Sequence, residues 1–100
     1  MVGTNFEKQP CVYILTSRNR KVLYIGVTSQ LKQRVWQHKH KVSAGFTAKY
    51  NVCDLVYYEL FGSMKEAIER EKQLKRWRRS WKDELIVSMN PRWDDLYESL

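Results

Sequence analysis

Apolar residues recur along this chain first with the period of strands and then with the period of helices. Residues 11–16 and 22–25 are rich in β-branched and aromatic side chains and predict two strands, joined by a polar hairpin turn over residues 17–21. Residues 55–61 have the same character. The pattern therefore predicts three strands, of which the first two form a hairpin.

Three helices are expected around these strands. Thr28 or Ser29 can cap a first helix over about residues 30–42, and residues 43–46 break it and favour another short turn. Ser63 followed by Glu66 is a capping box that opens a long helix through roughly residue 79. Ser80 with Asp83 resembles a further cap, for a helix through about residue 89, and residues 90–91 then end regular structure.

The resulting order is β-β-α-β-α-α. It predicts an α+β fold, a compact α/β/α arrangement with a three-stranded, mainly antiparallel sheet flanked by helices. One hundred residues suffice for a single domain with one modest core.

Polar residues interrupt the apolar stripe of the first helix. Successive helical residues rotate by about 100°, which places His38 in the middle of the stripe of Leu31, Val35 and Val42, and Arg34 at its edge. His38 is either a hydrogen-bonded structural residue or a catalytic one. Arg34 is either an exposed charge whose stem packs on the sheet or a functional cation.

A carboxylate occupies the same kind of position in the long helix. Met64, Ala67 and Ile68 mark its buried stripe, and Glu71 falls at the centre of that stripe. An inward carboxylate is costly unless it is paired, binds a metal or opens into a cleft. A salt bridge from Arg34 to Glu71 that joins the two helices is one explanation, and a metal site is the other.

The two strands of the hairpin each carry a tyrosine. Alternation places Tyr13 on the opposite face from Val12 and Ile14, and Tyr24 opposite Leu23 and Ile25. Since the register cannot be read from sequence, whether the two tyrosines share a face stays open. Gly26 permits either a tight turn or the close approach of a ligand.

Charge is concentrated in one segment. Lysine and arginine total 18 against 11 acidic residues, for a net charge of +7. Six of these cations lie within residues 72–82, and without them the net charge would be +1. Such a cluster fits a polyanionic partner, most often nucleic acid, or else a solvated helix face. Lys75, Arg78 and Lys82 continue the line of Glu71 and predict a basic ridge.

Cysteine usage and hydropathy bear on the compartment. Cys11 and Cys53 are too few for a disulfide framework or a zinc site, and both occupy strand-like positions that favour buried free thiols. A reducing, cytoplasmic setting is expected. The chain carries no apolar run of bilayer length, and its N-terminal residues are polar, so neither a membrane span nor a signal peptide is expected.

Taken together, these residues resemble a GIY-YIG nuclease domain over about residues 10–93, with residues 1–9 and 94–100 as tails. Cys11-Val12-Tyr13 corresponds to the first tripeptide of the motif and Tyr24-Ile25-Gly26 to the second. Arg34, His38 and Glu71 follow in the order of the family's arginine, histidine and metal-binding glutamate. Residues 70–77 and 90–93 are similar to the small stand-alone members.

The sequence also departs from the family pattern. Cys11 stands where the motif name has glycine, and Val27 stands where repair-type relatives carry a lysine near the reactive water. No segment resembles the accessory domain of larger members, so a protein partner for target choice is a further possibility.

The resemblance implies a metal-dependent endonuclease that hydrolyses phosphodiester bonds, in DNA rather than RNA, during repair, recombination or nucleic-acid processing. It implies one divalent cation, Mg²⁺ or Mn²⁺, on Glu71. Arg34 would contact the phosphate, Tyr13 or Tyr24 would orient or deprotonate the attacking water, and His38 would position one of these groups. The nucleic-acid backbone would be tracked by Lys75, Arg78, Arg79 and Lys82.

Two other functions stay open. A nucleic-acid-binding module that cleaves weakly or not at all would use the same scaffold, and Val27 and the missing accessory domain support it. A protein-interaction domain would use the tryptophans, Trp77, Trp81 and Trp93, although such residues more often pack terminal helices together.

Overall fold

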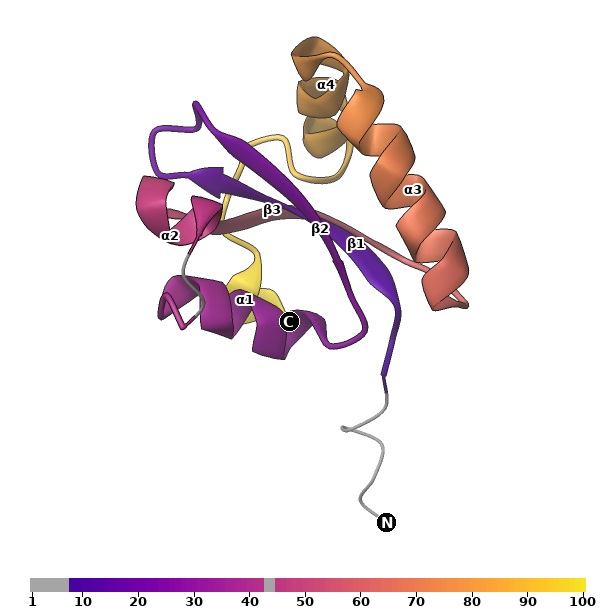
Figure 1. Cartoon of the computed structure of the whole chain (residues 1–100). Coiled ribbons are helices and arrows are strands. Elements are labelled where there is room, and N and C mark those ends of the chain that lie inside the picture. Colours follow the sequence, from indigo (N-terminus) through magenta and orange to yellow (C-terminus); the bar gives the residue numbers. More distant parts are fainter. Residues whose placement is uncertain (1–7, 43–44) are drawn as a thin grey trace.

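Three strands form one fully antiparallel sheet. The computed structural model describes residues 8–42 and 45–100. The strands β1 (Cys11–Ser17), β2 (Leu23–Thr28) and β3 (Val52–Leu60) lie in the order β2-β1-β3 (Figure 1). Every residue of β1 is buried, because this strand has a neighbour on each side and helices over both faces. The expected α+β fold with a three-stranded antiparallel sheet is confirmed.

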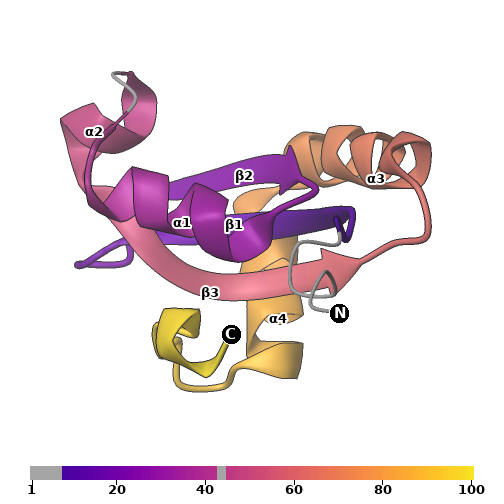
Figure 2. The same cartoon turned by 90° about the horizontal axis from the view of Figure 1, so that it is seen from below.

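Helices cover both faces of the sheet. They are α1 (Leu31–Lys39), α2 (Phe46–Tyr50), α3 (Met64–Arg76), α4 (Arg79–Met89) and the short 3₁₀ helix η2 (Tyr97–Ser99). Figure 1 shows α1 and the C-terminal end on one side of the sheet and α3 with α4 on the other, while β2 runs between α2 and α3. Figure 2, turned by 90°, shows α1 in front of the strands and α4 behind them.

Side-chain alternation along β1 divides the core into two clusters. Val12 and Ile14 pack with residues of α3 and α4, among them Ala67, Leu74 and Ile86. Tyr13 and Leu15 point to the other face and pack with Val35 of α1, with Tyr24 at the edge of this second cluster. The predicted alternation is confirmed, and the open question is answered, because the two tyrosines share the face that α1 covers.

The first helix is shorter than its periodicity predicted. It ends at Lys39, because Lys41 adopts the left-handed conformation (φ 52°), and Val42 is 60% exposed instead of lying on the buried stripe. The N-cap is Gln30 and no side chain caps the helix, although the hydroxyl of Thr28 accepts a hydrogen bond from the Gln30 N–H (3.0 Å). The expected short turn after it is the five-residue helix α2.

The two helices expected after β3 are both present, with the break between them slightly earlier than predicted. Ser63 caps α3 as predicted, since its hydroxyl accepts a hydrogen bond from the Glu66 N–H (3.2 Å). Trp77 and Arg78 then adopt extended backbone conformations, so that α4 begins at Arg79 and Ser80 lies inside the helix and is not its cap. Met64, expected on the buried stripe, is exposed at the first turn of α3.

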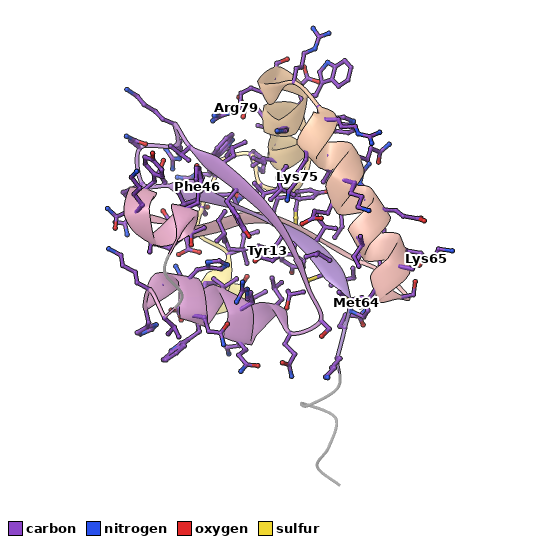
Figure 3. The ribbon with its side chains drawn as sticks, in the orientation of Figure 1. Tyr13, Phe46, Met64, Lys65, Lys75 and Arg79 are labelled. Atoms are coloured by element: carbon purple, nitrogen blue, oxygen red, sulfur yellow. The ribbon has the colours of Figure 1, made fainter. Side chains whose placement is uncertain are left out.

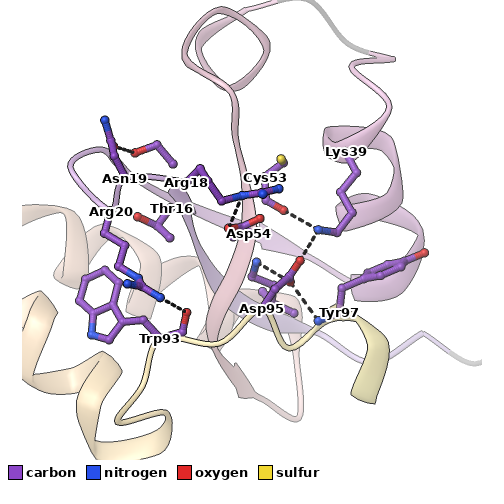
Figure 4. A network of polar contacts seen from close by, with 12 residues as sticks. Thr16, Arg18, Asn19, Arg20, Lys39, Cys53, Asp54, Trp93, Asp95 and Tyr97 are labelled. Atoms are coloured by element: carbon purple, nitrogen blue, oxygen red, sulfur yellow. Dashed lines mark hydrogen bonds and ion pairs between the residues drawn. The ribbon is translucent and has the colours of Figure 1, made fainter.

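Residues 94–100, expected as a tail, pack onto β3 and α1. Leu96 N–H donates to the Leu55 carbonyl (2.7 Å), and the Asp95 carboxylate accepts from the Leu55 N–H (3.0 Å). Lys39 bridges the same region, because its ammonium contacts Asp95 and donates to the Cys53 carbonyl (3.0 Å) (Figure 4). The C-terminus thereby fixes α1 against the sheet.

Both cysteines of the chain lie on strands of the sheet. Cys11 on β1 and Cys53 on β3 are both free cysteines, and burial raises the pKa of Cys11 to about 11, so this thiol stays protonated. Cys53 is only partly buried. Within residues 8–42 and 45–100, none of the helices has the length and apolar character that crossing a bilayer requires.

Candidate active site

The hairpin and α1 bring three of the expected site residues together. The Tyr13 hydroxyl lies 3.0 Å from His38 Nε2 in a buried hydrogen bond. The Tyr24 ring lies beside both, with centroid distances of 6.3 Å to Tyr13 and 5.6 Å to His38. The β1–β2 register, which pairs Tyr13 with Gly26, produces this arrangement because it places the two motif tripeptides side by side on neighbouring strands.

His38 is held at both ring nitrogens. Nδ1 lies 3.0 Å from the Thr47 hydroxyl, opposite the nitrogen that contacts Tyr13. Burial lowers the pKa of His38, and the nearby Arg34 charge lowers it further, so the imidazole is neutral at physiological pH. A neutral ring offers one donor and one acceptor, and the two hydroxyls satisfy both. The sequence did not single out Thr47, because only a short turn, and no helix carrying this residue, was expected after the first helix.

The two tyrosines differ in solvent access. Tyr13 is 1% exposed, and burial is the main reason that its pKa is raised to about 12. The charge that Tyr24 would carry raises it further, whereas the Arg34 guanidinium partly offsets the shift. Tyr24 lies on the edge strand β2 and is only half-buried. Of the two phenols, Tyr24 is therefore the one that a substrate or a water molecule can reach.

Gly26 is required by the position of Tyr13. A Cβ atom at residue 26 would lie 2.5 Å from both the Cζ and the hydroxyl oxygen of Tyr13, far closer than non-bonded atoms approach. The glycine of the second tripeptide thus makes room for the tyrosine of the first. From the sequence, either a tight turn or a ligand could explain a glycine at this position. In the structure, the group that needs the space is the side chain of Tyr13.

We expect Gly26→Ala to destabilise the fold by about 1–3 kcal/mol, the usual cost of inserting a methyl group into a packed site. Denaturant unfolding would measure it. Gly62→Ala is the matched control, because a Cβ there meets only Glu66 Oε1 at 3.7 Å, which is ordinary contact. Equal unfolding midpoints for the two variants would contradict this account of Gly26.

Arg34 lies next to this cluster, near enough to Tyr13 to influence its pKa. Its Nη1 donates to Gln37 Oε1 (3.1 Å), and it lines a small hollow of about 110 Å³ with Thr28 and three glutamines of and before α1, Gln30, Gln33 and Gln37. No ion pair joins Arg34 to an acidic side chain in the described part of the chain, so the Arg34–Glu71 salt bridge is not formed. Its charge is available to an anion.

Glu71 lies on α3 with its side chain 16% exposed and its carboxylate 3.3 Å from Lys75 Nζ. No hydrogen bond or ion pair joins it to Tyr13, Arg34 or His38 among the residues described. The adjacent Arg70 anchors this turn of α3 to β3 through two hydrogen bonds of 2.9 Å to the Glu59 carboxylate. The helix turn that carries Glu71 is therefore fixed relative to the sheet.

The residues around Glu71 can be tested against a metal. Within the described ranges, no three His, Cys, Asp or Glu side chains converge as a ligand cluster. Mg²⁺, however, keeps several waters and binds through one or two carboxylates plus substrate phosphates. A single partly exposed carboxylate that, in the described part of the chain, pairs with one half-exposed lysine fits that kind of site. It does not fit a cage of protein ligands.

A second hollow, of about 310 Å³, lies over β2. It is lined by residues of β2, α2, α3 and α4, namely Leu23, Tyr24, Ile25, Phe46, Lys75 and Lys82. Figure 3 shows Phe46 and Lys75 on opposite sides of β2. This hollow joins Tyr24 to two of the four cations that the sequence assigned to nucleic-acid binding. Phe46 was not singled out from the sequence.

The other two cations have partners of their own. Arg79 donates from Nη1 to the Lys21 carbonyl (2.8 Å) and from Nη2 to the Arg20 carbonyl (2.7 Å), so its guanidinium holds the hairpin turn against α4. Arg78 lies over the ring of Trp81, 4.6 Å from its centroid. The expected basic ridge therefore crosses the break between α3 and α4, and two of its cations also make contacts within the protein there.

The three tryptophans of this region differ in burial. Trp77 and Trp93 are partly buried and pack against the core cluster of α3 and α4, which is the structural role weighed for them above. Trp81 is 45% exposed and, with Trp77, lines a separate apolar hollow on α4.

Comparison with known proteins supplies a family. The model of the GIY-YIG catalytic domain matches residues 9–84. A UPF0213 protein of Clostridium perfringens is 36% identical over 77 residues, which are 77% of this chain and 82% of that protein. One of Bacillus pumilus is 34% identical, covering 67% and 68% of the two chains. The solution NMR structure of a UPF0213 protein from Bacillus halodurans superposes with a TM-score of 0.55 at 25% identity, covering 87% of this chain and 92% of that one.

Proposed function

Because the chain belongs to the GIY-YIG catalytic domain family, a family of nucleases, we propose that it is an endonuclease that hydrolyses phosphodiester bonds in DNA with one divalent cation, Mg²⁺ or Mn²⁺. One observation carries this proposal. The Tyr13–His38 hydrogen bond, Gly26 and the accessible Tyr24 form a single cluster beside an arginine that has no acidic partner among the residues described. A purely structural cluster would not need that uncompensated charge at its rim.

Glu71 is the residue proposed to hold the cation. The carboxylate would exchange its Lys75 partner for the ion, at small cost because Lys75 is half exposed. Bound there, a divalent cation supplies charge neutralisation at the phosphate and stabilisation of the leaving oxygen. The released Lys75 ammonium stays beside Tyr24, where it adds positive charge to the hollow.

Arg34 is proposed to bind the phosphate from the side of α1. A guanidinium offers a planar fork of donors that matches phosphate oxygens, and it stays charged at any physiological pH. Because no carboxylate neutralises it within the described residues, its whole charge acts on an incoming anion. Such a donor stabilises the charge that develops in the transition state.

Tyr24 is proposed to orient the attacking water and to take its proton. Nearby positive charge favours the ionised form of a phenol, and Lys75 and Lys82 line the same hollow. Tyr13 is the less suitable base, because burial raises its pKa to about 12 and its phenolate form is therefore scarce at neutral pH. Tyr13 and His38 would instead position Arg34 and Tyr24.

Lys75 and Lys82 are the cations best placed to follow the nucleic-acid backbone, with Arg78 on the corner between α3 and α4. Arg79 would add to the electrostatic field while its donors hold the hairpin turn. Target choice would come from a protein partner or from the shape of the nucleic acid, in repair, recombination or related processing.

A weakly cleaving nucleic-acid-binding module is the second candidate, and the position of Val27 favours it. Val27 packs at the margin of the core cluster of α3 and α4, so no side chain at this position assists the water. The sequence of repair-type relatives places a lysine there.

A cleavage panel separates the two functions. Purified protein is incubated with single-stranded, duplex and flapped DNA, and with matched RNA, in Mg²⁺, in Mn²⁺ or in EDTA. We expect DNA cleavage that requires the cation and stops in EDTA. If the protein retards these substrates in a gel but cuts none of them under any condition, the binding module is the correct function.

A further inference from the structure

We propose that the hollow over β2, lined by Tyr24, Phe46, Lys75 and Lys82, is a stacking site for one unpaired nucleobase, with the lysines holding the adjoining phosphate. This inference deepens the proposed function and rests on it, because it places that nucleotide beside the bond to be cut. It also assigns a function to Phe46, which the family motif does not include.

The aromatic wall of the hollow is built from two elements. Phe46 on α2 lies over Tyr24 on β2, with ring centroids 6.3 Å apart and planes inclined by 28°. Phe46 remains 48% exposed, although phenylalanine side chains are usually buried. Tyr50, one helical turn further along α2, is also exposed and packs against Phe46. An exposed aromatic surface of this kind suits the π-face of any base.

The charge of the hollow suits a phosphate. Lys75 and Lys82 reach it from α3 and α4, and none of the residues that line it is acidic. Lys75 also contacts Glu71 (3.3 Å), so the hollow adjoins the carboxylate proposed to hold the cation. Aromatic and cationic groups in one groove are the combination by which proteins bind single strands without reading sequence.

The dimensions of the hollow and the stacking geometry define the ligand. About 310 Å³ lies at the small end of the volumes of ligand sites, which suits one nucleotide and not a helical segment. Within a duplex both faces of each base are covered by neighbouring pairs, so that only an unstacked base can reach an aromatic ring. The ligand class is therefore a single strand, or the unpaired part of a flap or junction.

The test measures binding without cleavage, in EDTA, with fluorescently labelled oligothymidylate, oligouridylate and a DNA duplex as probes. We expect Phe46→Ala to weaken binding of the single strands roughly 5- to 100-fold, the range found for one stacked base, and to leave duplex binding unchanged. Phe46→Trp should restore single-strand binding. Comparing the affinities for the two single strands shows whether the site responds to the sugar or to the methyl group of thymine.

Phe46→Leu guards against a packing effect, since leucine keeps apolar volume without a π-face. It should weaken single-strand binding as alanine does while keeping the melting temperature of the wild type. Lys82→Ala should lower the slope of log affinity against log salt by about one. Lys65→Ala is its matched control, because Lys65 lies at the far end of α3 from Lys75 (Figure 3) and should leave affinity unchanged.

The outcomes separate this proposal from the proposed function. If cleavage requires the cation but Phe46→Ala and Phe46→Leu bind single strands like the wild type, the stacking site is refuted and the nuclease stands. If single-strand binding depends on Phe46 but no substrate is cut, the site stands and the nuclease does not. Equal loss of duplex and single-strand binding in Phe46→Ala would also overturn the stacking site.

Discussion

Glu71→Ala is expected to reduce metal-dependent DNA cleavage by about a thousandfold or more while the fold stays intact. Stabilisation of phosphate charge by a bound cation amounts to several kcal/mol, and ~4 kcal/mol corresponds to three orders of magnitude in rate. The loss of the Glu71–Lys75 pair should cost the fold less than about 1 kcal/mol, because the lysine is half exposed. Single-turnover cleavage in Mg²⁺ and in Mn²⁺, with a thermal melt, measures both effects.

Glu69→Ala is the matched control for this variant. Glu69 lies on the same helix two residues earlier and is exposed, and its substitution removes an identical charge. The Glu69→Ala variant should cleave at the wild-type rate. Wild-type cleavage by Glu71→Ala, or an equal loss in both variants, would show that Glu71 does not hold the cation.

Tyr24→Phe is expected to lower the cleavage rate by about 10²- to 10⁴-fold, the usual contribution of a positioned acid or base. The variant loses only the hydroxyl of a residue that lines the hollow, and it keeps the ring that lies beside Phe46 and His38. Substrate affinity measured in EDTA should therefore stay unchanged. The comparison of rate with affinity shows whether the hydroxyl acts on the reaction or on binding.

Tyr13→Phe tests the other tyrosine, because the sequence alone does not distinguish the roles of Tyr13 and Tyr24. Its hydroxyl is buried against His38, so its removal should leave one ring nitrogen of His38 without a partner and cost stability, about 1–3 kcal/mol. Its effect on the cleavage rate should be smaller than that of Tyr24→Phe. A larger rate loss in Tyr13→Phe than in Tyr24→Phe would reverse the roles proposed for the two phenols.

The strands and their faces could be predicted because period-two alternation is a local property. Val12 and Ile14 pack on one face, and Tyr13 packs on the other, as the pattern of residues 11–16 indicates. The pairing of Tyr13 with Gly26 could not be read, since the register depends on how the hairpin closes. The order of the motif residues was enough to indicate the family, whereas the contacts among these residues could not be predicted from their order.

The helix ends were predicted less well, for identifiable reasons. The apolar period of α1 continues to Val42, but the chain turns at Lys41 through a left-handed conformation that sequence does not announce for a lysine. The break at Trp77 and Arg78 contains neither glycine nor proline, the residues that usually mark such a break. Directly after this break, Arg79 makes tertiary hydrogen bonds to the hairpin turn.

The candidate site was therefore predicted as a set of residues but not as a set of neighbours. His38 was foreseen on the apolar stripe, and it is buried there. Its second partner, Thr47, and the aromatic Phe46 come from α2, a helix of five residues that is too short for its period to be recognised. Short elements between motifs are where site residues of this kind escape sequence reasoning.

The two hydrogen bonds from Arg79 to the turn carbonyls have a consequence for the order of folding. The β1–β2 hairpin is local in sequence, whereas Arg79 lies 58 and 59 residues beyond the carbonyls that it holds. Contacts across such separations form after local ones, since more chain entropy is lost in closing the loop. We expect that a chain emerging from the ribosome forms its hairpin early but fixes it only once α4 has been made, so that the candidate site would not be held in place until synthesis is nearly complete.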